Sequence, residues 1–353
     1  MFFQNVSPLP FSQLAQIVAT IAAEARCDVR FGLVTYRDHP PEDTTFVCRA
    51  APFTRDPAAM QRAVDAMVAT GGGDGPEALA DGLRAACEMA WRPEPATTRI
   101  AVVVTDAPPH GLEPAVHGRA ADAFPAGCPC GTDPLAVAHA MAARGIVVYA
   151  LGAEPALSGF VLARDLLRAL ARITGGQFVP LSSAALLADV IVGSALEELE
   201  LAALLDQVHI AAEAVPGSKE DVARSVAAAL QGQCVTTTRV VIDDLYGGAL
   251  PELDAGWALC RSVGEARARY GATTPRVRAR VRVAEDTHGE PAPPPVPPRV
   301  HWCSGSSSGS TDDVCMTDGD EPVQRAAIVR GAITVEQVTR LLDKELHAGM
   351  FDQ

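Results

Sequence analysis

Residues 69–83 read ATGGGDGPEALADGL, and residues 100–111 read IAVVVTDAPPHG. In the first stretch Asp74 and Glu77 follow three glycines and open an alanine-rich helical pattern, and in the second Asp106 ends a run of valines. A near-continuous β-branched run is typical of a strand buried on both faces of a sheet. Carboxylates in loops are the oxygen ligands that hard cations prefer. The two stretches therefore predict a buried strand beside acidic loops.

Strand and helix patterns alternate around these stretches, from residue 28 to residue 180, which is typical of an α/β fold with a mostly parallel sheet. Residues 29–36 and 45–53 are short apolar strands joined by a proline-rich turn, and this close spacing predicts an antiparallel edge hairpin. Pro76 suits the first turn of a helix that runs to Met89. Further strands are predicted at 99–105, 146–151 and 177–180, and helices at 57–70, 134–144, 162–173 and 184–205.

The quoted loops resemble two of the three metal loops of the von Willebrand factor type A family. Residues 74–77, DGPE, and then 81–83, DGL, look like the second loop of the integrin β-subunit version, and Thr105-Asp106-Ala107 looks like the third. The resemblance implies a doubly wound sheet that carries a metal-ion-dependent adhesion site at its carboxyl edge. It also implies that the family domain spans residues 1–195. The stretches RFGLVTYRDHPPED, GGGDGPEALADGL and TDAPPHG are similar to type A domains found beside alpha-kinase catalytic domains and in stand-alone proteins.

The first loop of the family does not match. In the family a central strand ends in DxSxS, and no DxSxS occurs in this chain. The helical pattern of residues 11–25 resembles the helix that follows that loop, so we expect a domain that is N-terminally incomplete and lacks its first central strand. The strands at 29–36 and 99–105 would then lose their shared neighbour. Residues 235–243, VTTTRVVID, are a weak candidate to replace it.

The resemblance assigns Asp74, Glu77 and Asp106 to a Mg²⁺ or Mn²⁺ site. Glu77 and Asp106 would bind the ion directly or through water, and a carboxylate of the partner would complete an octahedron. The alternative is that Asp74 and Glu77 only stabilise a helix N-terminus, where acidic side chains interact favourably with the helix dipole. A site with so few protein ligands would bind its ion weakly.

A second candidate metal site lies on the long loop between residues 107 and 132. Cys128 and Cys130, with His110 and His117 upstream, could bind zinc. A CxC pair without a second closely spaced pair is a weak signal, and the alternative is a proline-constrained turn with buried thiols.

The turn after the strand at 29–36 carries Asp38, His39 and Asp43. No other candidate site residue can be placed beside them from the sequence. We interpret them as turn residues, in which Asp side chains bond to the neighbouring backbone.

Beyond residue 195 the patterning changes, and three further parts are predicted. Residues 196–283 form a small α+β appendix, with a helix at 218–230 capped by Ser218. Residues 284–325 are rich in Pro, Ser and Gly and form a disordered linker. Residues 326–353 form a C-terminal amphipathic helix, whose apolar stripe either folds back or binds a partner.

Composition narrows the classes of function. The chain has 353 residues and a net charge of −14, which argues against broad nucleic-acid binding. Its only lysines, Lys219 and Lys344, do not follow a GxxxxG stretch, which excludes a P-loop. Nine cysteines without a spacing framework favour a reducing compartment. With no secretory signal and no uncharged apolar run that could span a bilayer, we expect a cytoplasmic protein that does not insert into membranes.

These patterns predict a protein–protein interaction module. We expect it to bind an acidic residue of a protein partner through the ion held near Asp74, Glu77 and Asp106, and we do not expect an enzyme. One alternative is a metal-independent scaffold that binds through the C-terminal helix. Another is a metal-dependent hydrolase that uses Asp106 and His110.

Overall fold

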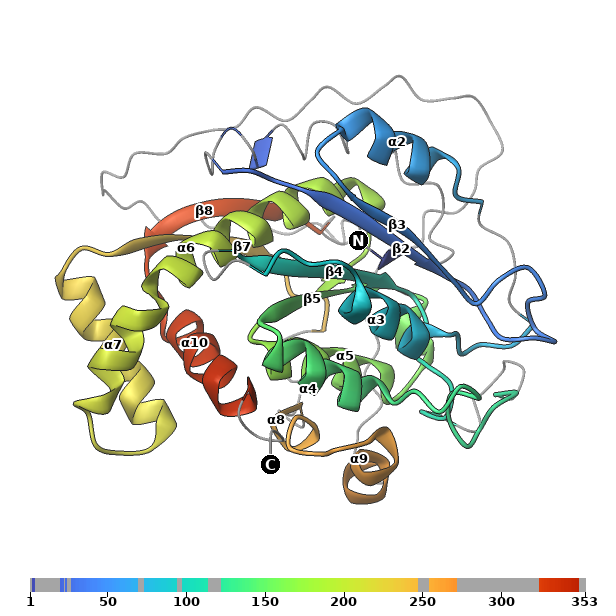
Figure 1. Cartoon of the computed structure of the whole chain (residues 1–353). Helices are drawn as coiled ribbons and strands as arrows, with labels where there is room; N and C mark the ends of the chain where they lie inside the picture. Colours follow the sequence, from blue (N-terminus) through green and yellow to red (C-terminus); the bar gives the residue numbers. More distant parts are fainter. Residues whose placement is uncertain are drawn as a thin grey trace, which may run out of the picture. The chain divides into compact units, whose positions relative to one another are not determined.

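A computed structural model describes residues 2–3, 20–21, 23, 27–68, 73–93, 97–113, 122–246, 254–271 and 324–348. Six strands of these residues form one sheet in the order β3-β2-β1-β4-β5-β6 (Figure 1). All neighbouring pairs are parallel except β2 and β3, so the predicted doubly wound sheet and its antiparallel edge hairpin are confirmed. The strands are β1 (Phe2–Phe3), β2 (Phe31–Tyr36), β3 (Cys48–Thr54), β4 (Arg99–Thr105), β5 (Ile146–Ala153) and β6 (Phe178–Leu181).

The central position of the sheet is filled, which corrects the expectation that the first central strand is missing. Phe2 pairs with Val34 of β2 and with Val103 of β4, and Phe3 pairs with Thr35. Two residues in the middle of a sheet can form hydrogen bonds with the strands on both sides. A segment of two residues is too short to show the alternating pattern by which a strand is predicted from a sequence. The predicted helix at 11–25 lies largely outside the described residues.

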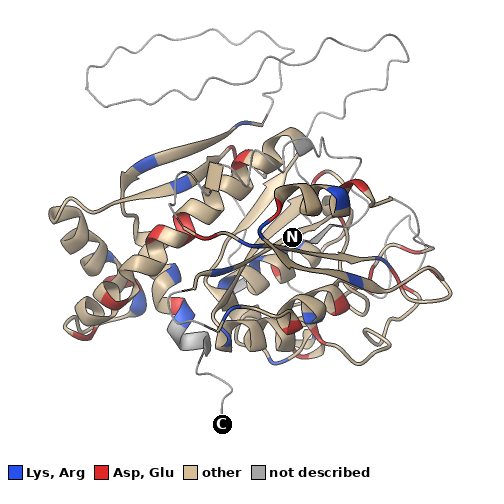
Figure 2. Ribbon diagram, turned by 45° about the horizontal axis from the view of Figure 1, so that its top comes forward, with Lys and Arg blue, Asp and Glu red and all other residues tan. Residues whose placement is uncertain are grey.

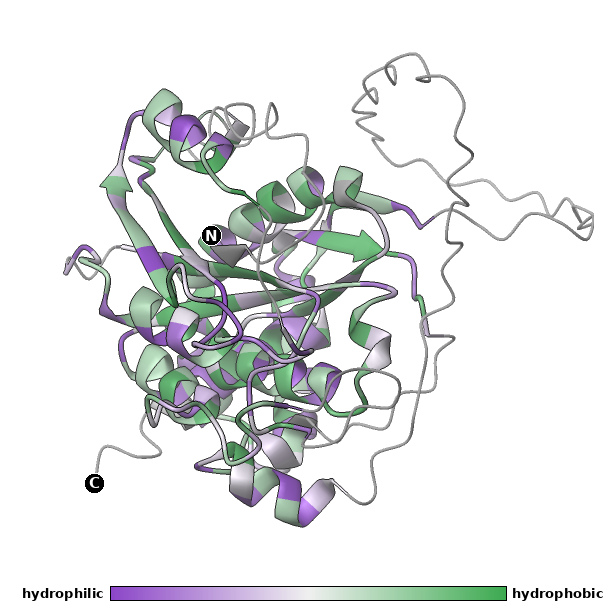
Figure 3. Cartoon of the chain, turned by 90° about the vertical axis from the view of Figure 1, so that its right-hand side faces the viewer, coloured by the Kyte–Doolittle hydropathy of each residue, from purple (hydrophilic) through white to green (hydrophobic). Residues whose placement is uncertain are grey.

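Successive side chains of the central strands point to opposite faces of the sheet and so divide the apolar core into two layers. In β4, Ala101 and Val103 face one apolar cluster, and Val102 and Val104 face the other. The first face is covered by α3 (Leu79–Glu88), α4 (Pro134–Ala143) and α5 (Ala163–Thr174), and the second by α2 (Pro57–Asp65) and α6 (Leu187–Glu213) (Figure 1). Figure 3 shows the hydrophobic strands enclosed between these helices. Burial on both faces accounts for the valine-rich sequence of β4.

Helices α2 and α4 begin at capping residues, whereas α3 begins later than its sequence predicts. Asp56 accepts a hydrogen bond from the backbone N–H of Ala58 at 2.9 Å, and Asp133 accepts one from Leu135 at 2.9 Å, each with proline at the first helical position. Pro76 is not in the first turn of a helix, because α3 begins at Leu79. The backbone N–H of Glu77 instead donates to the carbonyl of Pro108 at 2.9 Å. This bond ties residues 76–78 to the loop after β4.

The C-terminal part of the chain contains α7 (Lys219–Gly232), β7 (Thr236–Ile242), α8 (Asp254–Trp257), α9 (Val263–Tyr270), β8 (Ala326–Ala332) and α10 (Val335–Ala348). Strand β7 pairs antiparallel with β8, so residues 235–243 do not replace a strand of the large sheet, and that prediction is wrong. Helix α6 runs without interruption across the predicted boundary at 195–196. Described residues on both sides of that boundary belong to a single compact unit formed by Met1–Val281 and Gln324–Gln353. The predicted linker at 284–325 lies outside the described residues except for Gln324 and Arg325.

The predicted C-terminal helix folds back onto the domain. Its capping box is confirmed, because Thr334 N–H donates to Gln337 Oε1 at 3.0 Å and Gln337 N–H donates to Thr334 Oγ1 at 3.2 Å. Val338 and Leu341 are fully buried in an apolar cluster with residues of α6 and α7. The apolar stripe is therefore largely used within the chain.

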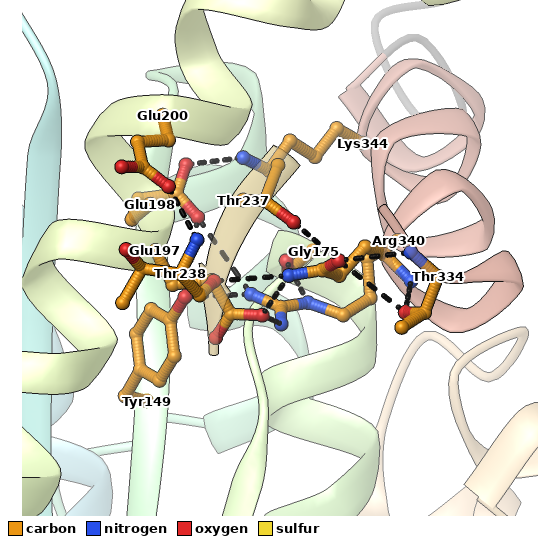
Figure 4. A network of polar contacts seen from close by, with 11 residues as sticks. Tyr149, Gly175, Glu197, Glu198, Glu200, Thr237, Thr238, Thr334, Arg340 and Lys344 are labelled. Carbon is orange, nitrogen blue, oxygen red and sulfur yellow. Dashed lines mark hydrogen bonds and ion pairs between the residues drawn. The ribbon is translucent and has the colours of Figure 1, made fainter. Parts of the chain in front are cut away.

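A buried polar network on α10 fixes this packing (Figure 4). Arg340 donates to Glu197 of α6 at 3.0 Å, to the Tyr149 hydroxyl at 2.6 Å and to the Gly175 carbonyl at 3.1 Å. Lys344 pairs with Glu198. The guanidinium group thus joins α10 to α6, to β5 and to the end of α5.

Replacing Arg340 should destabilise the fold strongly. Arg340→Met leaves Glu197 buried without its cation, and the expected loss is about 3–5 kcal/mol in the free energy of unfolding. Arg330→Met is a matched control, because its pair with Glu200 is exposed and such pairs contribute about 0–1 kcal/mol. Urea unfolding of the full chain measures both values, and equal effects would contradict the role of the buried network.

Candidate functional site

Four loops meet beyond the carboxyl ends of β2 and β4. They are residues 37–47 after β2, 73–78 before α3, 106–113 after β4, and 122–133 before α4. Backbone hydrogen bonds connect them: Ala78 N–H donates to the Arg37 carbonyl at 2.9 Å, and Glu77 N–H donates to the Pro108 carbonyl. Ligand sites of open α/β sheets lie at this edge, beside the point where strand order reverses.

A buried histidine connects three of the loops. His110 Nε2 lies 2.5 Å from Asp38 Oδ1, and His110 Nδ1 lies 2.8 Å from Asp122 Oδ1. Burial alone would lower the pKa of His110, but the hydrogen bonds and charges of Asp122 and Asp38 raise it to about 9. At neutral pH the ring is therefore a cation that donates from both nitrogens.

Asp74 lies beside this histidine. Its Oδ2 accepts a hydrogen bond from Ala123 N–H at 2.6 Å, and burial raises the pKa of Asp74 to about 6, with Asp38 and Asp122 acting in the same direction. Asp38, Asp74 and His110 offer ligand atoms within 4.8 Å of one another. Asp74 Oδ1 and Asp38 Oδ2 are buried and have no hydrogen-bond partner among the described residues. Two such oxygens fit a hard cation or a further donor.

Glu77 and Asp106 lie around Tyr36, at the end of β2. Burial raises the pKa of the Tyr36 hydroxyl well above its usual range, and the charges of Asp106 and Glu77 raise it further. Glu77 is buried and Asp106 is half-buried. The charges of Glu77 and Asp106 thus act on one hydroxyl, whereas Asp74 is joined to Ala123 by a hydrogen bond and lies close to Asp38 and His110.

A second close group contains His39, Asp81, Cys128 and Cys130, whose ligand atoms also lie within 4.8 Å of one another. Asp81 Oδ2 is 3.0 Å from His39 Nε2 and 2.9 Å from Cys128 Sγ. Cys128 Sγ is 3.6 Å from His39 Nε2. Burial raises the pKa of the Cys128 thiol to about 11, so the metal-free thiol donates to the Asp81 carboxylate.

The predicted turn role is confirmed for Asp38, whose Oδ1 accepts from His39 N–H at 2.6 Å, and for Asp43, which accepts from Thr45 N–H at 2.7 Å. The interpretation of Asp38 and His39 as turn residues alone is corrected, because both side chains belong to close groups of possible ligands. Cys128 and Cys130 lie with His39 and not with His110, and His117 lies outside the described residues. No spacing pattern in the sequence links these side chains, because they come from segments separated by tens of residues.

Fold and site together define a class: a doubly wound α/β domain with acidic side chains in the loops at the carboxyl ends of its parallel strands. A family model described as the von Willebrand factor type A domain matches residues 1–109. The chain is also similar to alpha-protein kinase vwkA of Dictyostelium discoideum, with 35% identity over 104 residues. Residues 1–109 of the chain are therefore similar to the von Willebrand factor type A family.

These similarities cover parts of the proteins. The match to the Dictyostelium kinase spans 30% of this chain and 16% of the kinase. Among solved structures, proximal thread matrix protein 1 from the mussel byssus is 18% identical with a TM-score of 0.35, over 54% of this chain and 45% of that chain. An uncharacterized membrane-spanning protein from Vibrio fischeri is 19% identical with a TM-score of 0.18, over 51% of this chain and 81% of that chain. Structural similarity at this level carries no functional inference.

The charged state of His110 predicts a specific pH dependence of stability. Its folded-state pKa of about 9 lies above the unfolded value of about 6.5, so the stabilisation is fully present below about pH 6.5 and is lost as pH rises through about 9. The full pH-dependent contribution of His110 to the free energy of unfolding amounts to at most about 3 kcal/mol. The pKa of Asp74, about 6, affects a lower pH range. Urea unfolding in a metal chelator should show this loss in the parent chain.

His110→Gln is the comparison for that measurement. Glutamine retains a hydrogen-bond donor but does not titrate. The variant should be less stable at pH 6.5 and should lose little further stability between pH 6.5 and 9. Parallel stability curves of the parent and the variant across this range would contradict the charged pairing.

Proposed function

We propose that this chain is a protein–protein interaction module that binds an acidic residue of a partner through a divalent cation, Mg²⁺ or Mn²⁺, at the carboxyl edge of its sheet. The observation that carries the proposal is the placement of Glu77 and Asp106 in neighbouring loops beside the central strand. Domains of the von Willebrand factor type A family are commonly protein-interaction modules, and residues 1–109 match that family.

The protein supplies oxygen ligands of the kind that Mg²⁺ and Mn²⁺ prefer. In the proposal Glu77 and Asp106 hold the ion, and Asp74 contributes negative charge next to it together with Asp38. A bound ion would neutralise these carboxylates and attract the carboxylate of a partner. Because few protein ligands are involved, we expect weak binding of the ion until the partner completes its coordination.

A hydrolase that uses Asp106 and His110 is less well supported. A general base must reach a water molecule or the substrate. The side chain of His110 is fully buried, and both of its ring nitrogens are bound to carboxylates. We therefore propose that the protein is not an enzyme.

A metal-independent scaffold that binds through α10 is also less well supported. Val338 and Leu341 on this helix are buried against α6 and α7. Among the described side chains of α10, Val335 is the exposed large hydrophobic residue, with 40% of its surface accessible. Binding through the apolar stripe would require the helix to leave its buried polar network.

Charge and cysteine chemistry support the remaining parts of the proposal. Basic and acidic residues are interspersed over the elements drawn in Figure 2, and the net charge is −14, so we propose no nucleic-acid partner. Among the described residues no helix has the length and apolarity needed to cross a membrane. The described cysteines are free thiols, which fits the reducing conditions of the cytoplasm, our proposed location.

Metal titration tests the ion site. In calorimetry of the full chain we expect weak, saturable binding of Mn²⁺ and Mg²⁺. Asp106→Asn keeps the shape of the side chain and removes its charge, so it should weaken binding by at least about 10-fold, equivalent to about 1.4 kcal/mol. Asp206→Asn, on the exposed side of α6, is the matched control and should bind as the parent does. A folded chain that shows no binding heat at millimolar Mn²⁺ or Mg²⁺ would contradict the ion site.

A peptide selection tests the partner chemistry. Random peptides selected on the parent chain in Mn²⁺ should share an acidic residue, because a carboxylate is the expected last ligand of the ion. Their binding should be lost in a chelator and in Asp106→Asn. Peptides that bind equally well in the chelator would favour the scaffold alternative.

A further inference from the structure

The four residues His39, Asp81, Cys128 and Cys130, which we call the His39 cluster, come from two loops and one helix. His39 follows β2, Asp81 lies in the first turn of α3, and Cys128 and Cys130 lie in the loop before α4. We infer that the His39 cluster is a structural site for one Zn²⁺ ion. This site is distinct from the oxygen-lined site of the proposed function and does not depend on it.

Distances in the cluster fit a tetrahedral zinc ion. Bonds of about 2.3 Å to sulfur and about 2.0 Å to nitrogen place the two atoms about 3.5 Å apart in a tetrahedron. Cys128 Sγ and His39 Nε2 are 3.6 Å apart. Asp81 Oδ2 lies at hydrogen-bond distance from both atoms, 2.9 and 3.0 Å, and would move outward by about 0.5 Å around an ion.

The chemistry of the ligands selects the metal. Two sulfurs, one imidazole and one carboxylate are ligands that suit zinc, whereas Mg²⁺ and Ca²⁺ prefer oxygen alone. His39 and Asp81 are almost fully buried, and Cys130 is exposed. Four protein ligands leave no open position, as in structural zinc sites, and the exposed thiol marks the side from which an ion can enter.

The surroundings of the cluster hold its ligands in place. Asp81 Oδ1 is engaged by Arg84 at 3.2 Å and by Thr132 at 3.4 Å, so that Oδ2 faces His39 and Cys128. Backbone N–H groups of Cys130 and Thr132 partly oppose the effect of burial and Asp81, which together raise the pKa of the Cys128 thiol, so a bound ion has to displace its proton. Partners that orient a metal ligand in this way commonly change metal affinity by about 10–100-fold when removed.

A tight turn brings the two sulfurs together. Gly131 N–H donates to the Cys128 carbonyl at 2.9 Å, and Gly131 has a φ of +72°, a conformation that glycine adopts without strain. The turn of residues 128–131, CPCG, therefore presents both cysteines on the side of His39 and Asp81.

A zinc ion here would cross-link the loops that build the rest of the site. The loop of residues 122–133 supplies Asp122, which binds His110, and the N–H of Ala123, which binds Asp74. Zinc binding stabilises the folded state by the free energy of the bound ion. Removal of zinc should therefore loosen the loop of residues 122–133 first.

Metal analysis of the full chain, purified with reductant and without chelator, tests the site. We expect one zinc ion per chain by mass spectrometry of the metal. Replacement of zinc by Co²⁺ should give the visible absorption of a tetrahedral cobalt ion with a sulfur-to-cobalt charge-transfer band. Chains without stoichiometric zinc that also fail to give this spectrum on cobalt titration would overturn the proposal.

Variants identify the ligands. Cys128→Ser with Cys130→Ser should lose the zinc and the charge-transfer band. Cys48→Ser is the matched control, because Cys48 is close enough for its pKa to be affected by both cysteines but is not a member of the cluster. Zinc retained by the double variant, or lost in the control alone, would overturn the assignment of ligands.

Two further measurements keep the test decisive. If the double variant does not fold, a thiol-specific mercurial added to the parent chain should release its zinc, and a chain that keeps it would contradict thiolate ligands. Asp106→Asn should keep its zinc and lose only the Mg²⁺ and Mn²⁺ response. The zinc site and the proposed adhesion site can thus fail separately.

Discussion

The carboxyl edge of this domain depends on one buried ion triad, His110 between Asp38 and Asp122. The imidazolium joins the loops after β2 and β4 to the loop of residues 122–133. Two carboxylates of like charge could not be buried at this spacing without the cation between them. Asp74 and the His39 cluster reach their positions because this triad holds the three loops together.

Two chemically different groups therefore share the edge of one sheet. Glu77, Asp106 and Asp74 carry only carboxylate oxygens, whereas the His39 cluster offers sulfur and nitrogen as well. Soft sulfur ligands favour zinc, whereas hard carboxylate oxygens favour Mg²⁺ and Mn²⁺, so the two groups would bind different ions. In this account a permanent zinc ion stabilises the loops, and an exchangeable Mg²⁺ or Mn²⁺ ion provides the contact with a partner.

Sequence reasoning predicted the sheet well, because long β-branched runs such as β4 and capped helices such as α4 and α7 carry local signals. It missed β1, because the two residues Phe2–Phe3 are too few to show an alternating pattern. It also missed β8, whose partner β7 is some ninety residues away in the chain. It assigned Asp74, Glu77 and Asp106 to an ion site through resemblance, and this assignment stays a prediction, while the structure directs Asp74 to a different neighbour. Asp38 and His39 could not be assigned, since only folding brings them to His110, Asp81 and Cys128.

X-ray diffraction from crystals of the full chain grown with Mn²⁺, recorded on both sides of the zinc and manganese absorption edges, tests the account most directly. Anomalous scattering locates each metal by element and by position. The account predicts a zinc peak enclosed by His39, Asp81, Cys128 and Cys130 and a separate manganese peak beside Glu77 and Asp106. Manganese alone at both positions, or no peak at either, would contradict it.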